Sequence, residues 1–162
     1  MKGRKEYRTG AFEVRELEDG ARMLVGYPIV FNSETDIGGE FREVIRPGAL
    51  TKTLQEAGRR VVALYQHMSD RVLGRLGVNL SLVPDERGVR MELSLPDTTL
   101  ARDAYEEVRQ GILDGMSFGF RVVKELWDSG RNLREVLELE LFEVSVVTWR
   151  QVSAPSLLRV KT

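Results

Sequence analysis

Ser117 is the first residue of this sequence whose setting suggests chemistry, because it places a hydroxyl inside the strand-like run LDGMSFGFRV, residues 113–122. A buried strand rarely carries a hydroxyl without a partner, since burying an unpaired polar group costs free energy. Gly119 is expected to share the face of Ser117 and leaves room there for a backbone or ligand. Ser117 is therefore a candidate nucleophile, and a purely structural serine is the alternative.

A nucleophilic serine needs a base that accepts the hydroxyl proton and a third group that orients the base. His67 is the only histidine in the chain, and it ends the apolar run VVALYQH at residues 61–67. This position at the end of a predicted strand makes His67 the candidate base. The alternative is a histidine that only satisfies local hydrogen bonds at the strand end.

The candidate for the orienting group comes from the run LELELFEVSVVT, residues 137–148. Strict strand alternation predicts that one face holds Leu137, Leu139, Leu141, Glu143, Ser145 and Val147. Glu143 is then expected to point inward, while Glu138 and Glu140 lie on the opposite, solvated face. A buried carboxylate must be paired or hydrogen-bonded. Its partner is either the histidine N–H or one of the many arginines.

Period-two patterning predicts most of the elements that must position these residues. Strands are expected at 12–17, 22–31, 41–47, 61–67, 76–84, 88–96, 116–126 and 134–148, and helices at 49–58 and 98–113. Thr98 or Thr99 is expected to cap the second helix, with Leu100, Ala104, Val108 and Ile112 on one face. The expected fold class is mainly β with α, an α+β domain with a closed or nearly closed β-barrel and helices outside. A barrel is expected because a sheet with this many strands must protect its edges.

Composition narrows the function classes. The chain has 162 residues, 42% of them hydrophobic, a formal net charge of -1 and no cysteine. We expect one domain over residues 1–162, with 1–10 flexible. Disulfides, iron–sulfur clusters and Cys-dependent zinc sites are excluded, and neither a metal nor a cofactor is expected.

No nucleic-acid-binding motif, signal peptide or apolar membrane-spanning run is present, so neither a nucleic-acid nor a membrane partner is expected.

Several motifs in combination resemble a known family. VALYQHMSDRVLGRL, GILDGMSFGFRV and LELFEVSVVT occur in that order, after LVGYPIVFNSETD and FREVIRPGAL, so the similarity runs from about Ala21 to Thr148. The set resembles the tailed-bacteriophage prohead maturation serine proteases, which are related to herpesvirus assemblin. The resemblance implies a herpesvirus-protease-like barrel, with Ser117 as nucleophile and His67 as general base. Glu143 would be the third member, with Glu140 and Glu138 as weaker substitutes.

The resemblance is weaker after the last predicted strand. The family typically continues with a Thr-x-Pro-Ala turn, whereas this chain reads TWRQVSAPS at residues 148–156. Assemblin-like enzymes carry an arginine-bearing loop near the oxyanion site, so Arg150 is a candidate to stabilise the oxyanion directly or through water. The alternative is an exposed arginine without a catalytic role.

The activity that the resemblance implies is that of a serine endopeptidase. Its substrates would be the major capsid protein with its scaffolding segment or a separate scaffold protein, and the protease itself, with a homo-oligomer as an option. The protein would act inside the viral procapsid in the host cytoplasm, as either a mature or a trimmed form. Two alternatives remain: an inactive scaffold-like assembly module with the same barrel, and a small-substrate esterase. The chain lacks the usual esterase elbow G-x-S-x-G.

Overall fold

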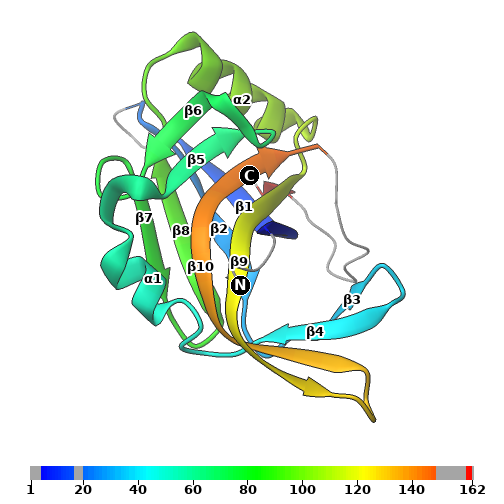
Figure 1. Ribbon diagram of the computed structural model, residues 1–162. Helices are drawn as coiled ribbons and strands as arrows, with labels where there is room; N and C mark the ends of the chain where they lie inside the picture. The colour runs from blue at the N-terminus through cyan, green and yellow to red at the C-terminus, as the bar shows by residue number, and fades with distance from the viewer. Residues whose placement is uncertain (1–4, 17–19, 149–159, 162) are drawn as a thin grey trace.

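The computed structural model of the chain describes residues 5–16, 20–148 and 160–161 (Figure 1). It is mainly β with two α-helices, as the sequence predicts. The strands are β1 (Lys5–Glu16), β2 (Arg22–Val30), β3 (Thr35–Ile37), β4 (Phe41–Ile45), β5 (Val62–Tyr65), β6 (Met68–Arg75), β7 (Leu80–Pro84), β8 (Gly88–Ser94), β9 (Gly115–Asp128), β10 (Leu133–Val147) and β11 (Val160–Lys161). The helices are α1 (Thr51–Glu56), the 3₁₀ helix η1 (Gly58–Arg60) and α2 (Thr99–Gln110).

The described strands form one sheet in which β10 is the central member. The hydrogen-bonded path runs β3-β4-β10-β9-β1-β2-β8-β7, with β5 attached to β10, β6 to β5 and β11 to β1. One edge of β10 pairs antiparallel with β9. The other edge pairs in parallel with β4 and, further along, with β5. Between β4 and β5, this edge of β10 forms hydrogen bonds with the segment around α1. Ala49 O accepts from Leu139 N and Thr53 Oγ1 accepts from Leu141 N, each at 3.0 Å.

The sequence predicts a closed or nearly closed barrel, and the sheet does not close into a barrel among the described strands. The path ends at β3 and β7, and β6 meets the start of β7 only through an isolated bridge between Leu76 and Leu80. The side-chain amide of Asn79 explains the interruption. Its Nδ2 donates to Leu73 O and Ser94 O at 3.0 and 2.9 Å, and its Oδ1 accepts from Arg75 N at 2.9 Å. Backbone groups that would otherwise pair two strands are thus satisfied by a side chain.

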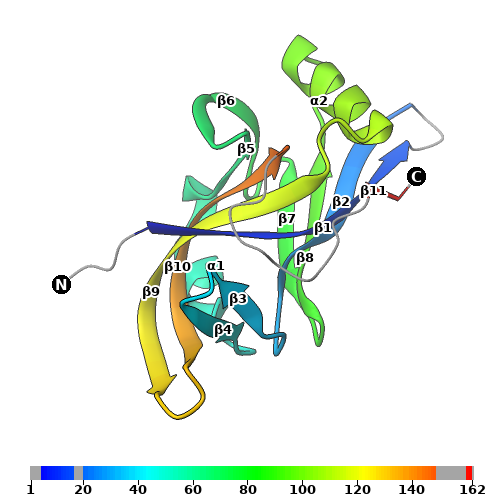
Figure 2. The same ribbon diagram turned by 90° about the vertical axis from the view of Figure 1, so that its right-hand side faces the viewer.

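Helix α2 follows the sequence prediction at its start and departs from it at its end. Thr98 caps the helix, because its Oγ1 accepts from Ala101 N at 3.1 Å. Gly111 then adopts a left-handed conformation with φ 81°, which ends the helix after Gln110. Ile112 therefore leaves the helical face and is 56% exposed, whereas Leu113 is fully buried. In Figures 1 and 2 the helix lies at one end of the sheet, on the side of β5 and β6.

Three strands, β3, β6 and the two-residue β11, and part of a fourth, β1, are absent from the sequence prediction. β3 and β6 are short or mostly exposed, so neither presents a sustained alternation of apolar residues. Residues 5–10 were expected to be flexible, whereas they belong to β1 and pair antiparallel with residues 116–121 of β9. Strand pairing with β9 supplies backbone hydrogen bonds that the polar composition of this segment does not reveal.

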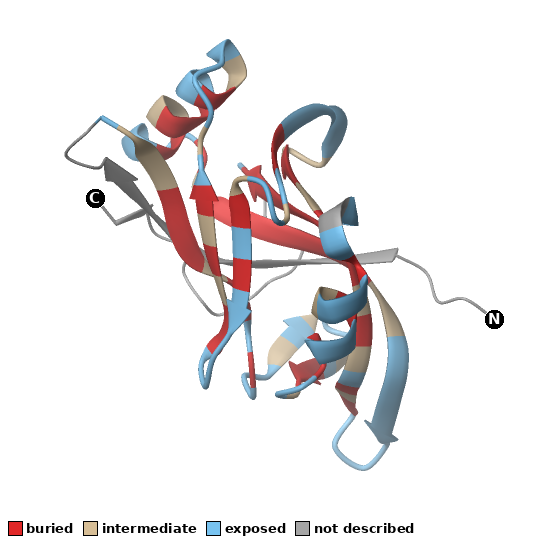
Figure 3. Cartoon of the chain, turned by 90° about the vertical axis from the view of Figure 1, so that its left-hand side faces the viewer, coloured by how far each residue is buried: buried red, intermediate tan, exposed pale blue. Residues whose placement is uncertain are grey.

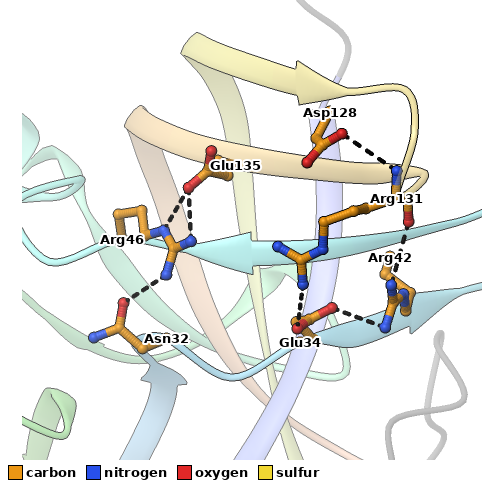
Figure 4. A network of polar contacts seen from close by, with 7 residues as sticks. All are labelled: Asn32, Glu34, Arg42, Arg46, Asp128, Arg131 and Glu135. Carbon is orange, nitrogen blue, oxygen red and sulfur yellow. Dashed lines mark hydrogen bonds and ion pairs between the residues drawn. The ribbon is translucent and has the colours of Figure 1, made fainter.

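The β9–β10 hairpin extends beyond the rest of the sheet, and β3 and β4 lie against it (Figure 2). Its end is largely exposed, whereas buried residues concentrate along the middle of the sheet (Figure 3). Ion pairs connect β4 and its neighbours to the hairpin (Figure 4). Arg46 contacts Glu135, and Glu34 contacts both Arg42 and Arg131. None of the helices in the described ranges is long and apolar enough to cross a membrane.

The best-buried of these links joins Glu43 on β4 to Arg134 on β10. Their side chains are 2% and 10% exposed, and both Nε and Nη2 of Arg134 donate to the same carboxylate oxygen of Glu43. Glu125 also approaches Arg134, with 3.4 Å between Oε2 and Nη1. A buried pair of this kind fixes the parallel register of β4 on β10, because losing one partner leaves a desolvated charge.

Glu43→Gln is therefore expected to lower the free energy of unfolding by about 3 kcal/mol, near the lower end of what breaking a buried pair costs, since Glu125 still faces Arg134. Urea denaturation of the variant and the parent protein measures this difference. Glu34→Gln is the matched control, because its ion pairs are exposed and it should cost less than about 1 kcal/mol. Equal losses in the two variants would contradict the structural role given to the buried pair.

Candidate active site

His67 sits in the two-residue turn that connects β5 to β6. Tyr65 and Met68 are paired across this turn, and both Gln66 and His67 have positive φ, 53° and 59°. Positive φ at both central residues is the pattern of a type I′ hairpin turn, which usually favours Asn and Gly. A glutamine and a histidine adopt this conformation at a conformational cost, so surrounding contacts must hold them in it.

Those contacts come from the end of β10 and from α2. Gln66 N donates to Val146 O at 2.9 Å, and the Gln66 side-chain amide forms two hydrogen bonds with Thr148, each of 3.0 Å. The Tyr65 hydroxyl donates to Glu107 Oε2 of α2 at 2.8 Å, which raises the pKa of Tyr65 above its ordinary value. The phenol therefore stays a donor at neutral pH, and the turn carrying His67 is fixed from both sides.

A β-bulge decides which way Glu143 points. Leu141 lies opposite Phe120 of β9, whereas Glu143 lies opposite Gly119. Two steps along β10 thus match one step along β9, which makes Phe142 the extra residue of the bulge. Phe120 and Gly119 are consecutive and face opposite sides of the sheet, so their partners Leu141 and Glu143 do as well.

The strict alternation assumed from the sequence is therefore wrong for β10. The hydrophobic core includes Leu139 and Leu141 before the bulge, and Val144 and Val146 after it. Glu143 lies on the other face from these residues, although it is only 9% exposed. A further irregularity between Val136 and Glu138 leaves Leu137 partly exposed, at 37%.

Glu143 contacts His67 on this second face. The Nδ1 atom of His67 lies 2.5 Å from Glu143 Oε1. The other carboxylate oxygen, Oε2, accepts the hydroxyl of Ser145 at 2.5 Å. The side chains of His67 and Glu143 are 20% and 11% exposed, so the pair is largely removed from water. A carboxylate on Nδ1 leaves Nε2 as the ring atom able to exchange a proton with a hydroxyl.

Ser117 lies on the neighbouring strand and on the same face. It is directly opposite Ser145 in the β9–β10 register, and Gly119, two residues further along β9, is opposite Glu143. Ser117 is fully buried, and its hydroxyl has no hydrogen-bond partner among the described residues. The structure thus places Ser117 on β9, Glu143 on the adjacent β10, and His67 in the turn after β5, which pairs with the other edge of β10.

The other candidate residues from the sequence do not join this group. Glu140 pairs with Arg121, and Glu138 lies 3.7 Å from the Lys124 ammonium. Of the three glutamates considered, Glu143 is the one in contact with His67. Arg150 lies outside the described residues.

Sequence reasoning missed the polar residues that surround the pair. Ser145 contacts Glu143 directly, and its hydroxyl also accepts from the His67 backbone N–H at 3.2 Å. The spacing of Ser145 two residues after Glu143 was the available signal, because i and i+2 on a strand share a face. The contacts of Gln66 with Thr148 had no comparable signal, since those residues are 82 positions apart.

A cavity of about 530 Å³ lies beside α1. Its other walls come from residues 121 and 123 of β9 and from residues 138–142 of β10. Arg121 and Val123 contribute to it from β9, on the face that also carries Ser117, and Phe142 contributes from the bulge. Ser117, His67 and Glu143 are not among its lining residues. Within the described part of the chain, no three His, Cys, Asp or Glu residues cluster as a metal site would require.

Comparisons with known proteins identify the family of the chain. The family profile described as Caudovirus prohead serine protease matches residues 10–154. The prohead protease of Enterobacteria phage HK97 is 32% identical over 143 residues, which are 85% of this chain and 60% of that protein. The prohead protease of Escherichia phage T5 is 29% identical over 87 residues, which are 54% of this chain and 40% of that protein. The chain thus spans only about half the length of these curated relatives.

The fold has a counterpart among solved structures. The bacteriophage T4 capsid assembly protease, gp21, superposes with a TM-score of 0.58 at 11% sequence identity, over 100% of both chains. This similarity concerns the fold, whereas the profile match covers most of the sequence and includes the segments that carry Ser117, His67 and Glu143. The chain belongs to the Caudovirus prohead serine protease family.

Proposed function

We propose that the protein is a serine endopeptidase with Ser117 as nucleophile, His67 as general base and Glu143 as the orienting carboxylate. The observation that carries this proposal is the 2.5 Å contact between His67 Nδ1 and Glu143 Oε1, on the sheet face that also holds Ser117. A buried histidine–carboxylate pair beside a serine without a described partner matches the requirements of nucleophilic serine catalysis.

The reaction would proceed by acyl transfer. Ser117 Oγ attacks the carbonyl carbon of the scissile peptide bond while His67 Nε2 accepts the hydroxyl proton. The imidazolium then gives this proton to the leaving amine, and the peptide C–N bond breaks to leave an ester on Ser117. Water, deprotonated by the same nitrogen, hydrolyses the ester and restores the hydroxyl. Throughout, the Glu143 carboxylate keeps the Nδ1 proton in place and stabilises the imidazolium.

Arg150 is proposed as a donor to the tetrahedral oxyanion, directly or through water. The support is its place in the sequence three residues after the end of β10, in the region where assemblin-like enzymes carry an arginine-bearing loop. An unchanged turnover number for Arg150→Ala would remove this residue from the mechanism.

The proposed substrates are the major capsid protein with its scaffolding segment or a separate scaffold protein, together with the protease itself. Membership of a prohead protease family supports this choice, as do the names of the relatives from phages HK97, T5 and T4. The site of action would be the interior of the procapsid in the host cytoplasm, where self-association is a further proposed contact.

Ser117→Ala is expected to reduce cleavage of unprocessed capsid and scaffold proteins from the same phage by at least roughly 10,000-fold, because it removes the attacking oxygen. Intact-mass analysis after incubation would detect discrete fragments with the parent protein only, and the fragment masses would locate the cleaved bonds. Equal cutting by both proteins would exclude Ser117 as nucleophile. Absence of cutting by the parent, both alone and inside assembled procapsids, would favour a non-enzymatic assembly role.

Glu143→Gln is expected to lower kcat by roughly 1,000- to 10,000-fold, because the amide keeps the size of the side chain but cannot stabilise the imidazolium. Glu140→Gln is the matched control. Its carboxylate pairs with Arg121 and has no described contact with His67, so kcat should stay within about threefold of the parent. Steady-state kinetics on one purified substrate would compare the two variants, and a larger loss in Glu140→Gln would transfer the orienting role to that residue.

A further inference from the structure

Ser145 occupies a position that the catalytic triad does not explain. It is 1% exposed, and its hydroxyl makes two hydrogen bonds. It donates to Glu143 Oε2 at 2.5 Å and accepts from the His67 backbone N–H at 3.2 Å. One buried hydroxyl therefore contacts both members of the pair: the side chain of Glu143 and the backbone N–H of His67.

We infer that Ser145 is a positioning residue that fixes the geometry of the His67–Glu143 pair, an inference that rests on the proposed protease function. A carboxylate that meets the imidazole through one oxygen can still rotate about its terminal torsion, because such sp³–sp² torsions are broad. Ser145 holds the second oxygen, so Oε1 stays directed at His67 Nδ1. The same hydroxyl holds the backbone of the turn in which His67 has its unfavourable positive φ.

The hydrogen-bond inventory also separates the roles of the two serines that face each other across β9 and β10. A serine hydroxyl has one proton to donate. Ser145 directs that proton to Glu143, which is itself directed at His67 Nδ1. The hydroxyl of Ser117 makes no such bond among the described residues. Ser145 is accordingly a fixed part of the pair's environment, and Ser117 is the hydroxyl available for attack.

A simpler role for Ser145 would be that of a buried hydroxyl that only satisfies its own hydrogen bonds. Both roles predict some loss of stability on removing the hydroxyl. They differ in catalysis, because a positioning residue affects the reaction after substrate has bound. Its loss lowers kcat with little change in KM, and it changes the environment of the His67 ring.

The paired variants Ser145→Val and Ser145→Thr isolate the hydroxyl, because both add similar volume at a buried strand position and differ mainly by that group. Ser145→Val is expected to lower kcat roughly 10- to 100-fold with KM within about twofold, the size expected from losing a hydrogen bond to a charged group. Ser145→Thr should recover kcat to within roughly fivefold of the parent. Equal kcat values for the two variants, with both folded by thermal melting, would overturn the inference.

Nuclear magnetic resonance of the His67 ring provides a readout that needs no substrate. Because the chain has a single histidine, ¹⁵N-histidine labelling gives one imidazole to follow. The parent and Ser145→Thr should show a ring N–H at Nδ1 that is protected from exchange by Glu143, and Ser145→Val should lose this protection. If the extra methyl group prevents folding, Ser145→Ala replaces both variants. Retained protection together with unchanged kcat in Ser145→Ala would then refute the positioning role.

The two readouts keep this inference separate from the proposed function. A parent protein that cleaves no capsid or scaffold substrate, even inside procapsids, would contradict the protease proposal. The resonance experiment would still decide whether Ser145 orders the His67–Glu143 contact. Conversely, an active parent whose Ser145→Val variant keeps both its kcat and the protected Nδ1 proton would leave the protease intact and exclude Ser145 as a positioning residue.

Discussion

A carboxylate that is buried within a sheet must find partners for both of its oxygens, and at Glu143 these partners belong to different parts of the chain. His67 takes one oxygen and Ser145 takes the other. Desolvation of the pair strengthens each contact, but it would also make an unpaired charge costly. Glu143 therefore links three features of the structure: the position of the β5–β6 turn, the conformation of β10 and the orientation of the histidine ring.

Strand β10 can serve both the core and the site because its faces exchange roles along its length. Before the bulge at Phe142, Leu139 and Leu141 pack into the core, and after it Val144 and Val146 do so. The exchange turns Glu143 and Ser145 toward Ser117 without interrupting the core. Bulges are common next to active sites for this reason, since one extra residue re-aims the side chains that follow it.

The histidine is placed by backbone geometry as much as by its own side chain. Two consecutive residues with positive φ would be unfavourable in isolation, yet Gln66 is tied to Val146 and Thr148, and Tyr65 is tied to Glu107 on α2. These contacts lie on both sides of the turn. Contacts with β10 and α2 therefore hold the turn in its unfavourable backbone conformation, and they fix the position from which the His67 ring extends.

The sequence by itself was sufficient to propose the chemistry. A single histidine, a serine in one apolar strand and a glutamate in another made Ser117, His67 and Glu143 the candidates, with Glu140 and Glu138 as substitutes, and alternation predicted most of the strands. The capped start of α2 at Thr98 was also predictable, because capping and strand alternation are local properties whose signals lie within a few residues.

Only the tertiary structure decided how these residues meet. The bulge at Phe142 depends on pairing with a strand some 20 residues away, and it reversed the face predicted for Glu143. The open sheet depends on Asn79, whose amide takes up backbone groups of β6 and β8. Ser145 became part of the site through a contact with a turn 78 residues distant. Strand register and long-range hydrogen bonds are set by the packing of whole strands, so local patterns in the sequence do not encode them.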